Sequence, residues 1–357
     1  MKKALLALAV AGAAVSAQAD VKLSGHVQTS FGDIEEFGQT VDTATGAVSN
    51  TNEESFSVNN TATSQSRFRI TSSKEAGGIT YGTNIEVGLR EGGGTNLRTR
   101  KNEVTMAGSF GKVSIGHGSE SSDGAVESSF SSTWVTWDDL SNYEVGYADL
   151  STTTNEFGIY EVIDGNRTNR IRYDSPKIAG VLTFSGDIQD DDDLVFAARA
   201  GNSNFAGALY HLARDADNAD EFGGSIAIKS GIFVASYGFA ERDAANTPGT
   251  AVAAGGAVSG ADESEAEYSV FNIGIETATY GLTLDMQNIE LDNNRADNVA
   301  GEVSTVGLNF TYKPTSGVTL FADIHRIEAD TTSVNAQLAG VNGVSGNGAT
   351  AGARITF

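Results

Sequence analysis

The chain of 357 residues holds 46 acidic and 23 basic residues, a formal net charge of −23, and it has 42 glycines and no cysteine. The acidic charge argues against nonspecific nucleic-acid binding, which needs a basic surface, and the lack of cysteine excludes disulfides, thiolate metal sites and cysteine nucleophiles. With 39% hydrophobic residues and a mean hydropathy of −0.18, the chain is too polar for a bundle of membrane helices. It is not too polar for a membrane β-barrel, which shows lipid only every second residue.

The first nineteen residues have the three parts of a secretory signal peptide. Two lysines follow the initial methionine, an apolar stretch of small residues and leucines covers 4–15, and Ala17-Gln18-Ala19 is the small-x-small pattern that signal peptidase cleaves. The apolar stretch is too short to span a bilayer. The sequence therefore predicts a signal peptide over 1–19 and a mature domain over 20–357, which keeps 21 basic and 46 acidic residues and a net charge of −25.

Along the mature chain, apolar and polar residues alternate with the period of two that marks a half-buried β-strand. Clear examples cover 79–89, 306–312, 318–325 and 353–357, and convincing helical periodicity is missing from the sequence. A soluble β-sandwich would show the same alternation. The pattern therefore predicts strands and leaves their architecture open.

The connections between these segments alternate in length. Seven are short turns, at 74–78, 109–111, 175–180, 201–204, 229–231, 277–281 and 313–317. Eight are longer polar segments, at 33–64, 91–95, 117–166, 189–193, 214–221, 241–267, 292–301 and 328–349. Fifteen connections imply sixteen strands, and an even count with both chain ends on the short-turn side is typical of an outer-membrane barrel. We therefore predict an all-β fold, a transmembrane antiparallel β-barrel of sixteen strands, with fourteen strands as the alternative.

Several separated blocks carry a family likeness over most of the mature chain. They are Val21-Lys22-Leu23-Ser24-Gly25-His26, Ser66-Arg67-Phe68-Arg69-Ile70, the run 108–117 (GSFGKVSIGH), Arg170-Ile171-Arg172-Tyr173-Asp174-Ser175-Pro176, the run 312–321 (YKPTSGVTLF) and the terminal Phe357. In this order, and behind a signal peptide, they resemble the trimeric general porins of Gram-negative outer membranes. That family uses its terminal aromatic residue as the signal for barrel assembly, so the resemblance assigns this role to Phe357.

The resemblance implies a function as well as a fold. Such porins form water-filled channels for passive diffusion of ions and small hydrophilic solutes, and they work as homotrimers among outer-membrane lipid and lipopolysaccharide. Neither a cofactor, a metal nor nucleic acid is expected as a partner. The third loop of the family folds back into the lumen and narrows it, with acidic residues facing basic residues on the opposite wall.

The segment 118–165 stands where that constriction loop belongs, and it contains no lysine or arginine. A charged ring in a narrow channel attracts ions of opposite charge and excludes those of like charge. The resemblance therefore marks seven acids of this segment as candidates for the constriction: Glu120, Asp123, Glu127, Asp138, Asp139, Glu144 and Glu156.

Arginines are the candidates for the opposite, basic wall. Alternation points Arg67 and Arg69 into the lumen, and likewise Arg170 and Arg172, because an arginine on the lipid face near mid-bilayer costs about 2–4 kcal/mol. Arg67 and Arg167 match the family's constriction arginines by resemblance, whereas histidines stand at two places where the family has lysine and arginine. The expected wall is His26, Arg67, Arg69, His117, Arg167, Arg170 and Arg172. Since neutral imidazoles weaken a positive wall, we predict a pore that prefers cations.

One strand conflicts with this scheme. Arg98 and Arg100 share a face with Val104 and Met106, which aims both arginines at lipid. Either a bulge changes the register within the strand, or the strand faces a neighbouring subunit.

Other functions remain open. A surface adhesin or structural barrel would have a plugged lumen and external loops that bind partners, and a substrate-specific porin would carry aromatic tracks or a phosphate site in its lumen. An enzyme is disfavoured, because the sequence holds four histidines and neither a His-Glu-x-x-His nor a Gly-x-Ser-x-Gly motif.

Overall fold

The computed structural model describes residues 20–42, 47–59, 66–89, 97–137, 145–149, 153–157, 167–190, 192–214, 219–245, 263–293, 299–333 and 344–357. The predicted signal peptide lies outside these residues. In the described part, no helix is long and apolar enough to cross a membrane.

Strands dominate the described part of the chain, with one short helix, α2 (Trp134–Trp137). The strands are β1 (Asp20–Asp42), β2 (Ala47–Asn59), β3 (Arg67–Ala76), β4 (Ile79–Leu89), β5 (Leu97–Gly108), β6 (Gly111–Ser119), β7 (Val145–Asp149), β8 (Thr153–Phe157), β9 (Arg167–Asp174), β10 (Leu182–Gln189), β11 (Leu194–Gly201), β12 (Phe205–Arg214), β13 (Ala219–Ser230), β14 (Phe233–Ala245), β15 (Glu263–Glu276), β16 (Tyr280–Asn293), β17 (Val299–Thr315), β18 (Val318–Ser333) and β19 (Val344–Thr356).

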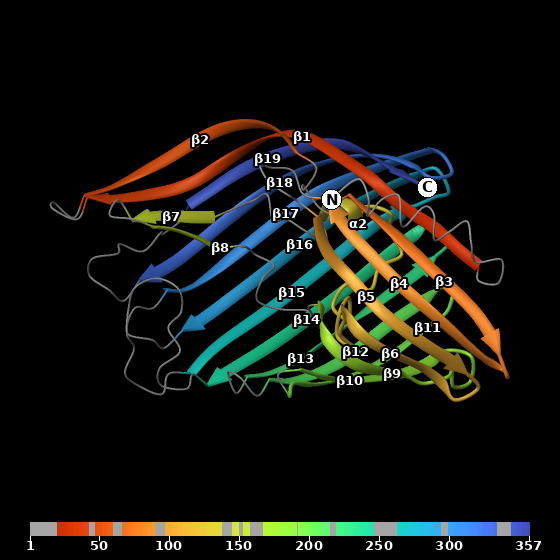
Figure 1. The fold of residues 1–357 in the computed structure, drawn as a ribbon. Helices are drawn as coiled ribbons and strands as arrows, with labels where there is room; N and C mark the ends of the chain where they lie inside the picture. Colours follow the sequence, from red (N-terminus) through yellow and green to blue (C-terminus); the bar gives the residue numbers. More distant parts are fainter. Residues whose placement is uncertain are drawn as a thin grey trace, which may run out of the picture.

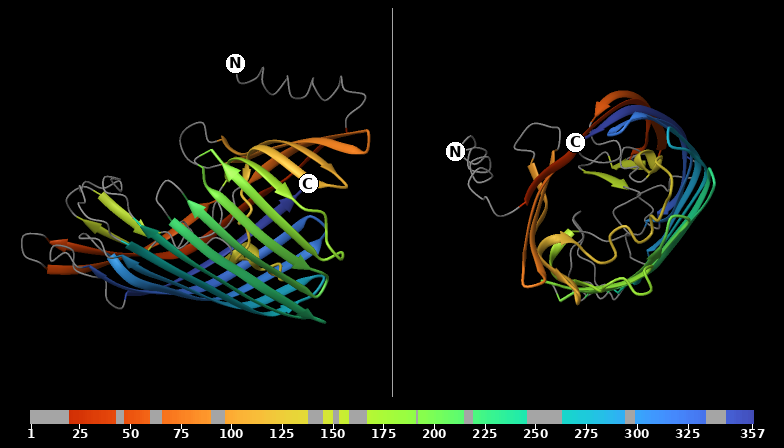
Figure 2. Two further views of the ribbon diagram at one scale, coloured as in Figure 1. Left: turned by 90° about the horizontal axis from the view of Figure 1, so that it is seen from below. Right: turned by 90° about the vertical axis from the view of Figure 1, so that its right-hand side faces the viewer.

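The strands form a closed antiparallel barrel of tilted strands (Figures 1 and 2). β19 pairs with β1 and closes the ring. β2 and β3 both pair with β1, so they are consecutive parts of one barrel strand. The hairpin β7–β8 belongs to the third long loop and joins the sheet only through a parallel pairing of β7 with β1. The described strands thus make a sixteen-stranded barrel, which confirms the predicted number and rules out fourteen.

The seven predicted short turns all connect neighbouring strands of the barrel. The turn between β3 and β4 shows why the sequence revealed them. Gly77 and Gly78 have φ angles of 61° and 75°, the left-handed region in which glycine is favoured and which a two-residue type I′ hairpin requires.

The first long connection differs from the prediction, which treated 33–64 as a loop. β1 and β2 stay in register from Ser30 opposite Asn59 to Asp42 opposite Ala47, although the pairing of β1 with β19 ends at Ile34. The sequence signal for strands is alternation, and alternation is needed only where one face meets an apolar phase. Polar residues on both faces can therefore extend a hairpin by backbone pairing alone.

The two faces of the barrel differ sharply in character. Large apolar side chains project from the outer face, where Leu23, Phe196 and Ile324 are 61%, 60% and 60% exposed. Polar side chains such as those of Asn272 and Thr311 project inward and are buried. This division is that of a barrel surrounded by lipid and filled with polar groups.

A row of four glutamates crosses four neighbouring strands on the outer face, toward the long-connection end. Glu241 of β14 lies directly opposite Glu267 of β15, Glu267 opposite Glu290 of β16, and Glu290 opposite Glu302 of β17. All four side chains are exposed. Like charges directly opposite each other on adjacent strands destabilise a sheet, so this glutamate row costs the barrel stability.

Replacing Glu267 by Gln is therefore expected to raise the free energy of unfolding, by roughly 0.2–1 kcal/mol at low ionic strength. The gain should shrink in high salt, because counter-ions screen exposed charges. Thermal unfolding of the purified barrel in detergent at two salt concentrations measures both effects. Glu328→Gln is the control, since Glu328 faces a cation, Arg326, at 2.8 Å. A lower unfolding temperature for Glu267→Gln at low salt would contradict the expectation.

Candidate functional site in the barrel lumen

The segment after β6, residues 119–137, runs along the inner wall of the barrel, inside the ring of strands (Figure 2). Three arginines fasten its first part by donating hydrogen bonds to backbone carbonyls. Arg170 donates to Ser119 at 2.9 Å, Arg172 to Glu120 at 2.8 Å, and Arg199 to Ser121, Ser122 and Asp123 at 2.6–3.2 Å. The start of the loop is thus clamped to β9 and β11.

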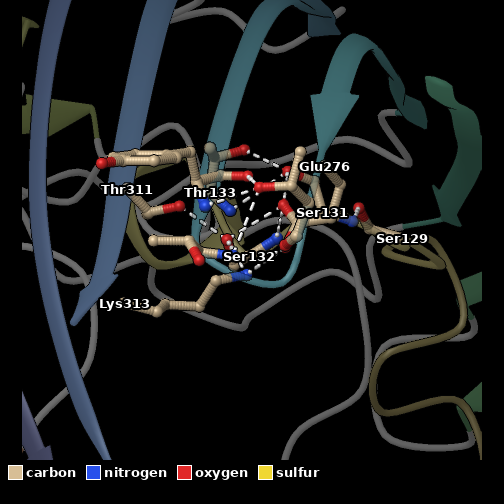
Figure 3. Close-up of polar contacts among 10 residues, drawn as sticks. Ser129, Ser131, Ser132, Thr133, Glu276, Thr311 and Lys313 are labelled. Carbon is tan, nitrogen blue, oxygen red and sulfur yellow. Dashed lines mark hydrogen bonds and ion pairs between the residues drawn. The ribbon is translucent and has the colours of Figure 1, made fainter. Parts of the chain in front are cut away.

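The second part of the loop is fastened by a polar cluster (Figure 3). Glu276, at the end of β15, accepts hydrogen bonds from the backbone N–H of Ser132 at 2.9 Å and from its hydroxyl at 3.0 Å. Lys313 of β17 forms an ion pair with the same carboxylate and donates to the Ser132 hydroxyl at 3.2 Å. The hydroxyls of Ser132 and Thr311 lie 2.6 Å apart. We call these four residues the serine anchor.

Further contacts extend the attachment across the wall. Ser225 of β13 donates to the carbonyl of Ala125, Thr133 pairs with Thr283 of β16, and Thr136 donates to Asn309 of β17. α2 itself contacts β17 and β18. The loop therefore lies against the inner wall from β9 to β18, and the part of the wall formed by β19, β1, β3, β4 and β5 faces it.

That facing wall carries a cluster of arginines around one buried carboxylate. Glu86 of β4 has a side chain only 1% exposed and meets three guanidinium groups. Arg67 lies 3.5 Å away, Arg100 donates at 2.8 Å, and Arg69 forms a close ion pair with it. Arg67 and Arg69 thus point inward, the direction that alternation indicated.

Arg100 reaches this cluster through a β-bulge. The pairing of β4 with β5 shifts between Glu86, opposite Lys101, and Val87, opposite Thr99. The extra residue turns Arg100 to the lumen side of β5, while Val104 keeps its outward direction, 57% exposed. Of the two explanations that the sequence left open, the bulge is the one found for Arg100. Past the bulge, Arg98 lies opposite Gly88, on the same face as Glu86, and its side chain is exposed.

Two more arginines complete what we call the arginine wall: Arg67, Arg69, Arg100, Arg167 and Arg354. Arg67 is within electrostatic range of Arg100, Arg167 and Arg354. Asp123, on the loop, forms an ion pair with Arg167 of β9 at 4.0 Å. The five arginines together with Glu86 and Asp123 carry a net charge of +3 among the described side chains. A positive surface here faces an acidic residue on the loop.

The predicted basic residues do not all belong to this wall. Arg170 is 6% exposed and pairs with Glu103 at 2.6 Å, and Arg172 pairs with Asp174 at 2.7 Å. Together with their bonds to the loop backbone, these contacts make both residues fasteners of the loop. His26 lies opposite Arg67 in the register of β1 and β3, on the lumen side with Gln28.

The assignment of His117 to the wall is wrong. His117 lies opposite Asn102 and Asn169, which are both exposed. It shares its face with Ile115, 48% exposed on the outside. The inward positions on β6 are occupied by its neighbours Gly116 and Gly118, which lie opposite inward-pointing residues of β5 and β9. The outward direction follows from the period of two in a strand.

The acidic residues predicted for the constriction also lie in different surroundings. Asp123 forms an ion pair with Arg167 of the arginine wall. Glu120 is completely buried, accepts a hydrogen bond from Gln189 and lies 4.0 Å from Arg214, so it serves the base of the loop. Glu127 is partly exposed, and the backbone of Glu156 lies in β8. Asp138, Asp139 and Glu144 fall outside the described residues.

The terminal residue closes the barrel edge. The backbone N–H and carbonyl of Phe357 exchange two hydrogen bonds of 2.9 Å with Gly25 of β1, and its ring is 57% exposed.

Five residues that organise the lumen were not predicted as site residues: Glu86, Arg100, Arg199, Glu276 and Arg354. The inward direction of Glu86 and Arg354 could be predicted from the sequence, because each residue stands on the polar face of an alternating segment. Alternation gives the direction of a side chain but not its partner. The partners come from strands far apart in the sequence.

A closed barrel with an apolar outside and a charged, loop-lined inside is the architecture of a membrane channel. A family model described as Gram-negative porin matches residues 4–332, and the chain belongs to this family. As a member of this family, the protein is a channel of an outer membrane. No curated protein sequence matches the chain.

Solved structures share the fold at low sequence identity. The anion-selective porin from Comamonas acidovorans is 15% identical, with a TM-score of 0.65 over 95% of this chain and 100% of that one. The outer membrane channel DcaP of Acinetobacter baumannii is 16% identical, with a TM-score of 0.61 over 96% and 98%. The trimer form of OmpT, an outer membrane protein of Vibrio cholerae, is 12% identical, with a TM-score of 0.58 over 95% and 100%. At these identities the likeness concerns the fold alone.

Proposed function

We propose that this porin is a water-filled channel through which ions and small hydrophilic solutes diffuse passively across the outer membrane. The observation that carries the proposal is the arrangement of the lumen, with residues 119–137 fastened to one side and the arginine wall on the other. The loop 118–165 is then the constriction loop, and solutes pass between it and the arginine wall. Charged groups in such a passage select ions by sign.

The ion preference that we propose is opposite to the one predicted from the sequence. The predicted preference for cations rested on two histidines in a weakened basic wall. One of them, His117, lies on the outer face, and Arg100 adds a cation that was not expected. The arginine wall together with Glu86 and Asp123 carries a charge of +3, which we call the net charge of the passage and which supports attraction of anions. We therefore propose a preference for anions in place of one for cations, and reversal potentials separate the two.

In a planar bilayer under a KCl gradient, the wild-type channel is expected to give a reversal potential whose sign indicates that chloride passes more readily than potassium. The double variant Arg67→Glu and Arg167→Glu changes the net charge of the passage from +3 to −1 and should reverse that sign. Arg326→Glu is the matched control on the outer face, where the side chain is 55% exposed, and it should leave the potential unchanged. A cation-selective wild type, or a double variant with unaltered selectivity, would refute the assignment of the arginine wall.

The proposal also covers how the protein is exported, how the barrel assembles and which molecules surround it. Residues 1–19 serve as the signal peptide, Phe357 as the assembly signal, and the mature barrel forms a homotrimer among outer-membrane lipid and lipopolysaccharide. The trimer form of the OmpT structure supports the trimer through the shared fold. An adhesin or structural barrel with a plugged lumen would give no discrete current steps in the same bilayer.

A further inference from the structure

One aromatic side chain of the loop in the lumen is exposed although its neighbours in the sequence are buried. Trp134 of α2 is 38% exposed, although Thr133, Val135 and Thr136 beside it are buried against the wall, at 0%, 1% and 1%. Tyr210 and Tyr268, two aromatic residues that point inward from the wall, are 2% and 6% exposed. An indole ring is therefore presented to the water of the lumen.

The ring is held next to the arginine wall. The guanidinium carbon of Arg354 lies 4.7 Å from the ring centroid of Trp134, in cation–π contact. Arg354 is 8% exposed, and its Nε donates to the side chain of Gln28 at 2.7 Å. This bond from β19 to β1 fixes the guanidinium beside the indole. The backbone of Gln28 in turn exchanges hydrogen bonds with the side chain of Ser66, the residue before Arg67, so the aromatic surface and the arginine wall adjoin.

An exposed aromatic surface beside several guanidinium groups has a specific chemical preference. Planar rings stack on indole in offset or edge-to-face arrangements, and carboxylates bind guanidinium groups by charge-assisted hydrogen bonds. Simple inorganic anions bind the guanidinium groups but do not stack on the indole, and neutral solutes do not form the charge-assisted bonds. A planar organic anion uses both at once.

We propose that Trp134 and the arginine wall form a binding subsite for planar organic anions, such as aromatic carboxylates. The proposal rests on the proposed channel function and names the solutes that the passage favours. The ring of the solute stacks on the exposed part of the indole, and its carboxylate lies against the arginine wall. Binding at such a site must stay weak, since a solute that binds tightly stops permeation.

The test compares two carboxylates of similar size that differ in planarity, benzoate and cyclohexanecarboxylate, as blockers of the KCl current in a planar bilayer. Stacking on the indole should let benzoate reach half-block at about a two- to tenfold lower concentration. Trp134→Leu keeps an apolar side chain without a ring and should bring the two concentrations together. Trp134→Phe should retain part of the difference, and Phe184→Ala, on the outer face, should retain all of it.

The outcomes separate this inference from the proposed function. Equal block by both acids in the wild type, or a difference that persists in Trp134→Leu, overturns the subsite while the KCl current still supports a channel. A wild type without any KCl current overturns the channel and the subsite together. If Trp134→Leu abolishes the difference between the two half-block concentrations but keeps the KCl conductance and thermal stability of the wild type, the effect comes from the missing ring and not from a misfolded loop.

Discussion

Replacement of Glu86 by Gln is expected to destabilise the barrel by about 3–5 kcal/mol, the usual cost of removing one partner from a buried ion pair. The side chain of Glu86 is 1% exposed and that of Arg100 is 10% exposed, so little water is available to solvate the guanidinium group of Arg100, whereas the side chains of Arg67 and Arg69 are 21% and 42% exposed. The change also raises the net charge of the passage from +3 to +4, so surviving channels should prefer anions more strongly than the wild type. Urea unfolding in detergent measures the first effect, and reversal potentials measure the second.

Glu328→Gln is the control for this prediction, because it removes a carboxylate from an exposed pair. Glu328 and Arg326 have side chains 58% and 55% exposed, and such surface pairs contribute about 0–1 kcal/mol. If Glu86→Gln unfolded at the same urea concentration as this control, Glu86 would not be the residue that holds the arginine wall together.

Replacement of Glu276 by Ala is expected to release the second part of the loop. The carboxylate accepts bonds from the backbone and hydroxyl of Ser132 and pairs with Lys313. Its loss leaves the backbone N–H of Ser132 without this acceptor, at a cost of about 1–3 kcal/mol, whereas the Ser132 hydroxyl keeps Thr311 and Lys313 keeps the carbonyl of Thr277 as partners. Since the loop then samples positions away from the wall, single-channel recordings should show greater open-channel noise than the wild type.

A reversible cross-link provides the control. The native chain has no cysteine, so Ser132→Cys and Thr311→Cys add one possible disulfide at a place where the two hydroxyl oxygens lie 2.6 Å apart. In the Glu276→Ala background, the oxidised channel should be as quiet as the wild type and should become noisy on reduction. Equal noise in Glu276→Ala and the wild type, with no effect of reductant, would refute the serine anchor.

The barrel could be predicted because its signals are local. Alternation within one strand gives the direction of each side chain, and glycine-containing turns such as Gly77–Gly78 mark where one strand ends and the next begins. Neighbouring strands in the sequence are neighbours in the ring, so the number of strands followed from the number of connections. The hairpin of β1 and β2 escaped this reasoning because its polar strands lack alternation.

Two side chains at the candidate site lie on a different face from the one first assigned. The resemblance of block 108–117 placed His117 in the lumen, whereas its neighbours in β6 put it on the outer face. For Arg100, the one-residue register shift between Glu86 and Val87 changes the face of the sheet on which the side chain lies. Such a shift depends on the partner strand, which one segment of sequence does not contain.

Strand period and turn chemistry act over a few residues, so the sequence predicted a barrel of sixteen strands, with fourteen as the alternative, and short turns at one end. The tertiary structure alone decided which charges meet in the lumen. Glu86 gathers arginines from β3 and β5, the serine anchor joins the loop to β15 and β17, and Trp134 meets Arg354 from the last strand. Each of these contacts joins residues brought together only when the ring closes and the loop lies against its wall.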